Sequence, residues 1–275
     1  MSRFKMLFTQ KFPIIGMIHV DPLPGTPLYA GNFDAVVKKA TLEADIFLQS
    51  GIDGLIIENM NDIPYVQSRC FTPETTACMS KISMTVKEVI RDNIPCGVQI
   101  LACGNREALA VSKACNLNFI RAEGFIFSHV ADEGLTNADA GQIIRYRKLI
   151  DAQHIGIITD IKKKHSSHAI TSDVSLADTA RAAEFFCSDG IVLTGKATGI
   201  ETNVEDLQSL INTVTLPLII GSGVTLHNIE NYWNCADAAI IGSYFKHDGD
   251  WKNDLCESKI YSFMQKIKLF RNQAK

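Results

Sequence analysis

Two glycine–serine pairs, each placed directly after an apolar run, could bind an anion through the main chain. Glycine lets the backbone approach a ligand closely, and successive N–H groups near a helix N-terminus can hold a phosphate without a cationic side chain. Either pair alone could simply turn the chain and cap a helix. Because the two turns match, we expect a phosphate site, which a threonine–glycine turn after a third run could complete. The residues predicted to bind this phosphate are Gly221, Ser222, Gly223, Gly242, Ser243, Thr194 and Gly195.

Three charged residues at the ends of other apolar runs could perform acid–base chemistry. Glu58 directly follows the apolar residues 55–57, where burial would raise its pKa toward the range useful for proton transfer. Asp160 could be a second acid or base, or half of a carboxylate pair for a divalent metal. Arg121 could bind a carboxylate or a second phosphate through paired hydrogen bonds, or hold Glu58 or Glu123 in place. For Glu58, an ion pair with Arg121 and a role in proton transfer are therefore equally well supported.

Other polar side chains stand at or just beyond the ends of the runs, where they could contact the same ligand. These candidates are His19, Asp21, Asn59, Gln99, Glu123, Lys162, His165 and His168. Histidine is the commonest metal ligand, but His165 and His168 lie in a serine-rich loop without an HExxH motif or a Cys-His set. We expect this loop to close over the ligand. The sequence leaves the metal unassigned, with a divalent ion such as Mg²⁺ as the candidate.

Two lysine-containing segments and one cysteine carry weaker chemical signals. The run Lys162-Lys163-Lys164 begins where a strand is expected to end, so one of its lysines could reach an anion. Lys196 does not stand in a GxxxxGK[ST] phosphate loop, so it gives no ground for nucleotide hydrolysis. Cys103 follows an apolar run without a recognisable base nearby, which favours a small buried residue over a nucleophile.

The apolar runs alternate with longer stretches of helical period, as is typical of βαβ units. Eight strands are predicted, at 14–20, 54–58, 97–101, 119–122, 156–160, 190–194, 218–221 and 238–242. The segments that follow strands are often long and polar, as at 19–32, 59–73, 123–138 and 160–174. This pattern predicts a single-domain (β/α)8 TIM barrel with its functional residues at the carboxyl ends of the strands. An open doubly wound sheet is the alternative, but no GxGxxG motif follows the first run.

Two of the expected helices show apolar stripes at i, i+3 and i+4 spacing. The stripes consist of Ile82, Val86, Val89 and Ile90 in one helix, and of Ile260, Phe263, Met264, Ile267 and Phe270 in the last. Ser175 and Asn203 each precede a helical stretch with acids in its first turn, so both are predicted to be N-caps.

Length and composition agree with one large domain, because 275 residues approach the roughly 250 of a single barrel. We expect a short N-terminal segment at 1–12 and the barrel at 13–275.

A net charge of −3 argues against a nucleic-acid partner, and no apolar stretch reaches the ~18 residues of a membrane span. Eight cysteines without a CxxC pair predict a soluble, intracellular protein. The N-terminal segment contains the basic residues Arg3, Lys5 and Lys11. It is therefore compatible with location in either the cytoplasm or the mitochondrial matrix.

Four motifs at the strand ends resemble those of the BtpA family. They are Ile15-Gly16-Met17-Ile18-His19-Val20-Asp21-Pro22-Leu23-Pro24-Gly25, Asp53-Gly54-Leu55-Ile56-Ile57-Glu58-Asn59, Phe119-Ile120-Arg121-Ala122-Glu123-Gly124 and Lys164-His165-Ser166-Ser167-His168. The resemblance covers about residues 13–245 and implies a ribulose-phosphate-binding-type barrel. It also implies a link to the role that gave the family its name, photosystem I biogenesis in photosynthetic bacteria.

Two functions remain open on these patterns. One is an enzyme that acts on a small phosphorylated sugar or nucleoside-like metabolite, with the phosphate at the glycine–serine turns and proton transfer by Glu58 and Asp160. The other, suggested by the resemblance, is a non-catalytic assembly or biogenesis factor that retains a barrel pocket, since function does not follow from fold. A homo-oligomer is compatible with both functions.

Overall fold

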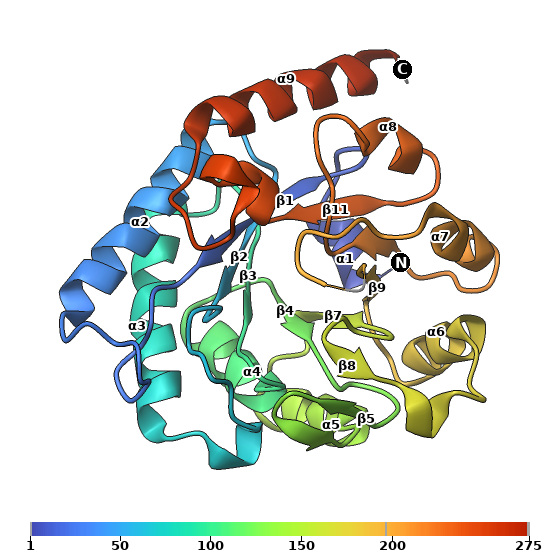
Figure 1. The fold of residues 1–275 in the computed structure, drawn as a ribbon, viewed down its shortest axis with the longest axis horizontal. Helices are drawn as coiled ribbons and strands as arrows, with labels where there is room; N and C mark the ends of the chain where they lie inside the picture. Colours follow the sequence, from blue (N-terminus) through green and yellow to red (C-terminus); the bar gives the residue numbers. More distant parts are fainter. Residues whose placement is uncertain (1, 196, 274–275) are drawn as a thin grey trace.

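A closed barrel of eight parallel strands forms the centre of the molecule (Figure 1). The computed structural model describes residues 2–195 and 197–273. In barrel order the strands are β1 (Ile14–His19), β11 (Ala238–Ile241), β10 (Leu218–Ile220), β9 (Gly190–Leu193), β7 (Gly156–Asp160), β4 (Phe119–Ala122), β3 (Cys96–Gln99) and β2 (Gly54–Glu58). Each corresponds to one predicted run, so the predicted (β/α)8 TIM barrel is confirmed.

All residues of these eight strands are buried, which explains why their sequences read as continuous apolar runs. Several strands end one or two residues before the predicted boundary. As a result Thr194, Gly221 and Gly242 lie just beyond β9, β10 and β11, at the rim of the barrel. The register places Glu58 of β2 between His19 of β1 and Gln99 of β3.

Helices cover the outside of the barrel (Figure 1). They are α2 (Phe33–Gln49), α3 (Pro73–Ile90), α4 (Asn105–Ala114), α5 (Ala140–Leu149), α6 (Leu176–Phe185), α7 (Val204–Leu210), α8 (Ile229–Tyr232) and α9 (Glu257–Gln273). The predicted N-caps are confirmed: the Ser175 side chain accepts from the Asp178 amide, and the Asn203 side chain accepts from the Glu205 amide. The predicted stripes of α3 and α9 supply Ile82, Val86, Ile90, Ile260, Phe263, Met264 and Ile267 to the buried core.

A second, smaller core fills the inside of the barrel. It is made of alternate strand residues, among them Ile15, Met17, Ile56, Phe119, Ile158, Val192, Ile219 and Ile240. The short helix α1 (Arg3–Leu7) closes the amino-terminal end of this core, because Phe4 and Phe8 pack against it and are almost completely buried. Residues from the predicted N-terminal segment thus belong to the packed barrel.

Three of the four predicted long loops contain short regular structure on the functional side of the barrel. A three-stranded antiparallel sheet joins β5 (His129–Ala131) and β6 (Gly134–Thr136), from one loop, with β8 (Ser166–Ser167), from the next. Short 3-10 turns occur at η1 (Ser68–Cys70), η2 (Ala169–Thr171), η3 (Ser243–Phe245) and η4 (His247–Gly249). Within the described residues, no helix combines the length and the apolar character that crossing a membrane requires.

Candidate active site

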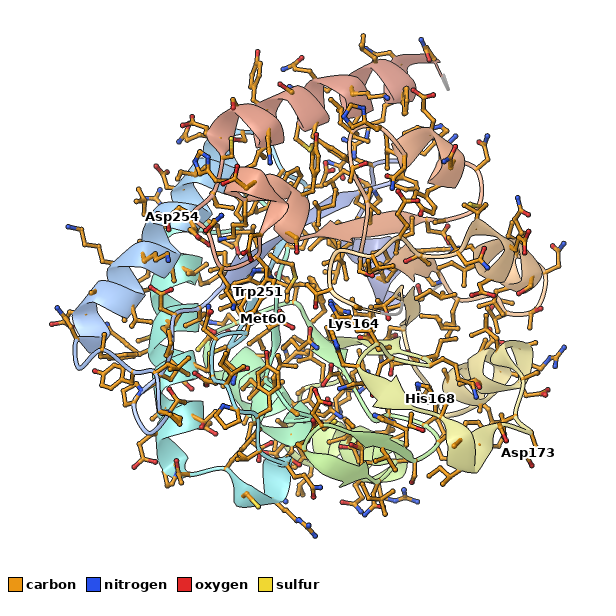
Figure 2. The ribbon with its side chains drawn as sticks, viewed as in Figure 1. Met60, Lys164, His168, Asp173, Trp251 and Asp254 are labelled. Atoms are coloured by element: carbon orange, nitrogen blue, oxygen red, sulfur yellow. The ribbon has the colours of Figure 1, made fainter. Side chains whose placement is uncertain are left out.

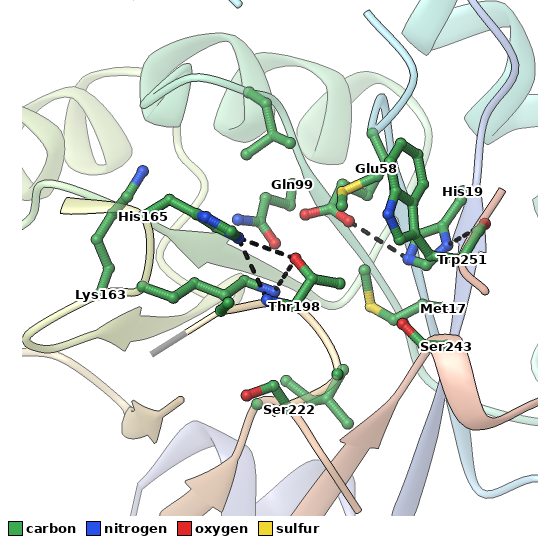
Figure 3. Close-up of a pocket in the computed structure, with 18 of the residues that line it drawn as sticks. Met17, His19, Glu58, Gln99, Lys163, His165, Thr198, Ser222, Ser243 and Trp251 are labelled. Atoms are coloured by element: carbon green, nitrogen blue, oxygen red, sulfur yellow. Dashed lines mark hydrogen bonds and ion pairs between the residues drawn. The ribbon is translucent and has the colours of Figure 1, made fainter. Parts of the chain in front are cut away.

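A cavity of about 450 Å³ lies at the carboxyl ends of the barrel strands. Met60, Lys164 and Trp251 are found near the centre of the view down the barrel, whereas His168 and Asp173 lie farther out (Figure 2). The predicted site residues that line the cavity are His19, Glu58, Gln99, Arg121, Glu123, His165, Gly221, Ser222, Gly223, Gly242 and Ser243. The structure therefore brings both glycine–serine turns and the acid–base candidate Glu58 to one cavity (Figure 3).

The two turns contribute main-chain N–H groups that are not used inside the described part of the protein. There, no hydrogen bond is donated by the amides of Ser222, Gly223, Val224, Ser243 or Tyr244, all of which belong to cavity-lining residues. An unused N–H group at a cavity wall can bind a ligand, and several such groups can together hold a phosphate. These five amides, in and just after the two turns, are therefore the candidate donors to an anion in the cavity.

The Ser222 hydroxyl has a structural role that the sequence does not reveal. It accepts a hydrogen bond of 2.8 Å from the Gly195 amide and donates one of 3.1 Å to the Ile200 carbonyl. The hydroxyl thereby ties the segment after β9 to the turn after β10. Gly195 and Thr194, expected to complete the phosphate pocket, do not line the cavity; the Thr194 hydroxyl instead accepts from the Lys164 amide at 3.2 Å.

Close packing explains why glycine occupies the first position of each turn. A Cβ atom on Gly221 would lie 3.0 Å from Nη2 of Arg121 and 2.6 Å from Val192. A Cβ atom on Gly242 would lie 2.9 Å from the imidazole of His19. Both glycines therefore leave room for side chains of the cavity wall, a reason that differs from the close approach of an anion expected from the sequence.

Glu58 is buried at the end of β2, with only 6% of its surface exposed. Burial raises its pKa to about 7, although the nearby positive charges of Arg121 and Lys164 oppose this shift. A carboxyl with a pKa near the operating pH can both donate and accept a proton. Glu58 therefore has the chemical character expected of a general acid or base.

His19 stands beside Glu58, with 3.7 Å between its Nε2 atom and Oε2 of Glu58 (Figure 3). Burial, reinforced by the charge of Lys246, lowers the pKa of His19 to about 3, so the imidazole is neutral and the contact is not an ion pair. Nδ1 lies 3.3 Å from the Trp251 carbonyl, which can only accept. The hydrogen of the neutral ring therefore resides on Nδ1, and the unprotonated Nε2 faces Glu58.

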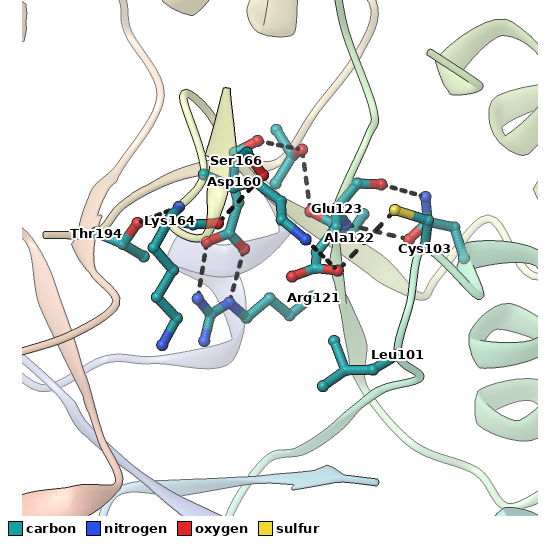
Figure 4. A network of polar contacts seen from close by, with 12 residues as sticks. Leu101, Cys103, Arg121, Ala122, Glu123, Asp160, Lys164, Ser166 and Thr194 are labelled. Carbon is teal, nitrogen blue, oxygen red and sulfur yellow. Dashed lines mark hydrogen bonds and ion pairs between the residues drawn. The ribbon is translucent and has the colours of Figure 1, made fainter. Parts of the chain in front are cut away.

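Arg121 is paired with Asp160 and not with Glu58. Its Nε and Nη2 atoms each donate a hydrogen bond of 2.7 Å to the Asp160 carboxylate (Figure 4). Burial disfavours the charged guanidinium, but Asp160 outweighs this effect and holds the pKa of Arg121 above its usual range. The predicted alternative of a Glu58–Arg121 ion pair is therefore wrong. Asp160 does not line the cavity, and each of its carboxylate oxygens accepts a hydrogen bond from Arg121, which leaves no free oxygen pair for a metal.

Two lysines from the predicted basic run line the cavity, and only one of them has a carboxylate partner. Lys163 forms an ion pair of 3.2 Å with Glu123. Burial would raise the pKa of Glu123, but Lys163 and Arg121 hold it below its usual value. The Nζ atom of Lys164 donates to the Thr198 hydroxyl at 3.1 Å, and within the described residues it has no carboxylate within ion-pair distance. Burial and the charge of Arg121 lower the pKa of Lys164.

Asp21 and Asn59 do not line the cavity, which corrects two predictions. Asp21 forms an ion pair of 3.0 Å with Lys39 of α2 at the half-exposed rim. Asn59 is buried and fixes the backbone near Leu101: its Oδ1 accepts from the Leu101 amide at 2.7 Å, and its Nδ2 donates to Asp62 at 2.9 Å. Both residues organise the loops around the site.

Lys162 and His168 also lie outside this cavity, and line a small separate recess. Lys162 donates to the Thr171 carbonyl at 3.1 Å, because its left-handed backbone (φ 46°) turns the chain after β7. His168 contacts the Lys163 carbonyl at 3.0 Å through Nε2, and its ring centre is 5.4 Å from that of His129. Both side chains therefore line a recess other than the cavity that Glu58 lines.

The histidines do not form a metal site in the described part of the chain. His165 lines the cavity, but its Nε2 contacts the hydroxyl and the amide of Thr198, at 3.1 and 3.2 Å. No group of three or more His, Cys, Asp or Glu side chains is placed to hold a metal among the residues described. The suggestion of a divalent metal consequently has no ligand set to support it.

Cys103 lies in a neighbouring groove, behind the hairpin of β5 and β6. Burial and the negative charge of Glu123 raise the pKa of its thiol well above the usual value. Because the thiolate is the nucleophilic form, this environment argues against a nucleophile, but Cys103 is half-buried and not the buried residue expected from the sequence. Lys196, the other residue weighed on sequence alone, lies outside the described residues.

Several cavity residues carry no signal in the sequence. Thr198 becomes important only because the tie at Ser222 folds its segment over the turn after β10. Trp251 comes from an irregular segment far from any strand end, yet its carbonyl fixes the tautomer of His19. Lys164 is one of three consecutive lysines, and nothing in the sequence distinguishes it from the other two.

A sequence model of the BtpA family matches residues 10–269. An uncharacterized mitochondrial protein of Caenorhabditis elegans is 43% identical and aligns over 96% of this chain and 95% of its own. The photosystem I biogenesis protein BtpA of Synechocystis is 30% identical, over 92% of this chain and 87% of its own.

Solved structures show the same barrel at much lower identity. Thiamine phosphate pyrophosphorylase from Pyrococcus furiosus has a TM-score of 0.58 at 12% identity, covering 96% of this chain and 98% of its own. A structure named KGPDC, from Streptococcus mutans, has a TM-score of 0.60 at 9% identity, covering 94% and 99%. These similarities establish the fold, and the match over nearly the whole length shows that the chain belongs to the BtpA family.

Proposed function

We propose that this protein is an enzyme that binds a small phosphorylated metabolite in the barrel cavity and transfers a proton through Glu58. The observation that carries the proposal is the presence, in one cavity, of the unused amides of the two turns and of a buried carboxyl with a pKa of about 7. The two turns suit a phosphate, and the buried carboxyl suits proton transfer.

The size and the remaining wall of the cavity support a small polar ligand. About 450 Å³ is within the range of small-molecule sites. The Oε1 atom of Gln99 is buried and, among the described atoms, has no hydrogen-bond partner. Since an unsatisfied buried acceptor costs free energy, a ligand hydroxyl that donates to Gln99 would be favoured. A phosphorylated compound with a hydroxyl near its reacting carbon fits these groups.

The relatives add a consistent but weaker indication. The name of the Pyrococcus enzyme mentions a phosphorylated compound, and that enzyme shares the fold alone. The Synechocystis relative is named for photosystem I biogenesis. Nothing in the geometry of the described residues favours an assembly factor, whereas the cavity favours a ligand-binding enzyme.

Binding of glycerol 3-phosphate and ribose 5-phosphate, measured by calorimetry and by the shift in melting temperature, tests the phosphate end. We expect Ser243→Asp to weaken binding at least tenfold, because its carboxylate would repel the phosphate at the second turn. Ser243→Asn is the matched control, since it has nearly the same size without the charge. Equal affinity of the two variants, or a lack of binding by the unmodified protein, would overturn the proposed site.

A further inference from the structure

We propose that Lys164 is the amine that attacks the carbonyl carbon of a phosphorylated aldehyde or ketone and forms an imine with it. The inference rests on the proposed function, because it places the phosphate of that substrate at the two glycine–serine turns. It goes further by naming a carbonyl group as the reacting centre and Lys164 as a catalytic residue.

The pattern of ion pairs distinguishes Lys164 from the other cations of the cavity. Arg121 is neutralised by Asp160 through two hydrogen bonds, and Lys163 is neutralised by Glu123. Lys164 donates only to the neutral hydroxyl of Thr198 in the described part of the chain. Its Nζ atom is therefore the cavity amine that no carboxylate holds in the protonated form.

The surroundings of Lys164 also favour the neutral, nucleophilic amine. Burial lowers its pKa, and the guanidinium of Arg121 lowers it further, while the carboxylates of Glu58 and Asp160 act in the opposite direction. A lysine that is desolvated or stands beside another cation is the usual form of an amine nucleophile. The guanidinium of Arg121, which its hydrogen bonds to Asp160 hold in place, thus supplies one of the charges that activate Lys164.

Position relative to the turns sets the length of a suitable substrate. Thr198, the partner of Lys164, lies in the segment that Ser222 ties to the first turn. The next residue, Gly199, approaches the second turn, because a Cβ atom built on it would lie 4.0 Å from Oγ of Ser243. The amine of Lys164 thus contacts the segment that reaches both turns, so a short carbon chain would join the phosphate to the carbonyl.

Glu58 provides the proton that the reaction requires. The lone pair of the neutral Nζ attacks the carbonyl carbon, and proton transfer from nitrogen to oxygen gives a neutral carbinolamine. The protonated carboxyl of Glu58 then gives its proton to the carbinolamine hydroxyl, which leaves as water while the nitrogen lone pair forms the C=N bond. The products are a protonated imine and the Glu58 carboxylate, so atoms and charges balance. A carboxyl with a pKa of about 7 can be protonated before this step and ionised after it.

Pyridoxal 5′-phosphate, used only as a chemical probe, tests this role because it carries an aldehyde and a phosphate on one small ring. We expect brief incubation followed by borohydride reduction and peptide mass spectrometry to label Lys164 at least tenfold more than other lysines. Inorganic phosphate should compete with the labelling, and Lys164 should react at a lower pH than Lys162. Labelling spread over surface lysines, with Lys164 unmodified, would overturn the proposal.

Two lysine variants and Ser243→Asp separate this inference from the proposed function. Lys164→Arg should abolish the selective label with little change in melting temperature, whereas Lys162→Arg, outside the cavity, should retain it. Ser243→Asp should reduce labelling of Lys164 and leave that of Lys162 unchanged. If phosphate esters bind but Lys164 remains unlabelled, imine formation is refuted while the phosphate site stands. If neither occurs, both proposals fail.

Discussion

Arg121 and Asp160, on the adjacent barrel strands β4 and β7, form a buried pair through two parallel hydrogen bonds of 2.7 Å. Each side chain is about 95% buried, so neither charge can be compensated by water if the other is lost. The pair holds the guanidinium at the cavity wall, where its charge acts on both Glu58 and Lys164.

Asp160→Asn should therefore lower the free energy of unfolding by about 3–5 kcal/mol, the usual cost of leaving one buried charge unpaired. Urea denaturation at pH 7 measures this change. The matched control is Asp178→Asn, which removes an exposed ion pair with Arg181 and should have little effect. Equal stability of the two variants would show that the Arg121–Asp160 pair is not a structural element.

Glu58→Gln should flatten the dependence of stability on pH. Because burial raises the pKa of Glu58 in the folded state to about 7, the folded protein binds a proton that the unfolded chain has released. Its contribution is complete below the unfolded pKa and is lost as the pH rises through about 7, a change of roughly 3 kcal/mol. The free energy of unfolding, followed from pH 5 to pH 8, tests this expectation.

The quantity to compare is the difference in free energy of unfolding between Glu58→Gln and the unmodified protein at each pH. Asp139, whose pKa burial also raises to about 7, produces the same trend in both. Glu58→Gln should thus be relatively more stable at pH 8 than at pH 5. Parallel curves for the two proteins would mean that Glu58 has an ordinary pKa.

Gly242→Ala should displace the imidazole of His19, since the added Cβ would lie 2.9–3.0 Å from its ring atoms. We expect a loss of about 1–3 kcal/mol in the free energy of unfolding, as for other overpacked sites. Gly141→Ala in α5 is the control, because its Cβ would meet only the flexible end of Arg145, at 3.2 Å. That variant should lose no stability, and an equal loss in both would contradict the packing argument.

Phe4→Ala should destabilise the whole barrel, although the residue is only the fourth of the chain. Its side chain is 3% exposed and packs in the inner core, so its removal should cost about 3–5 kcal/mol. Met6→Ala, two residues away on a side chain that is 59% exposed, should change stability little. Thermal unfolding of the two variants makes the comparison, and similar melting temperatures would show that α1 does not close the barrel.

The barrel strands could be predicted because burial on both faces leaves a strong local signal. The three residues of β5 and of β6 leave no such signal, since they pair with each other and with β8 in a small sheet above the barrel. β5 and β6 form a hairpin within one loop, and β8 joins them from another loop that is distant in the sequence. Sequence patterns therefore identified the eight strands and treated the covering sheet as loop.

Within the site, the sequence locates strand ends better than it locates side chains. Glu58, His19 and Gln99 are neighbours because their strands pair in register. The three lysines after β7 diverge, since the left-handed backbone at Lys162 sends their side chains to different partners. Position along the chain could not predict that Lys163 and Lys164 line the cavity while Lys162 does not.

The cancellation of charge by the two cavity ion pairs has a consequence for selectivity. With Arg121 and Lys163 already neutralised, Lys164 is the one uncompensated lysine or arginine among the described cavity residues, and Asp132 and Glu133 add negative charge at the wall. A single phosphate bound by neutral amides is compatible with that balance. A diphosphate or triphosphate would bring more negative charge to a wall that already carries Asp132 and Glu133, so we expect the cavity to bind a monophosphate ester more tightly than either.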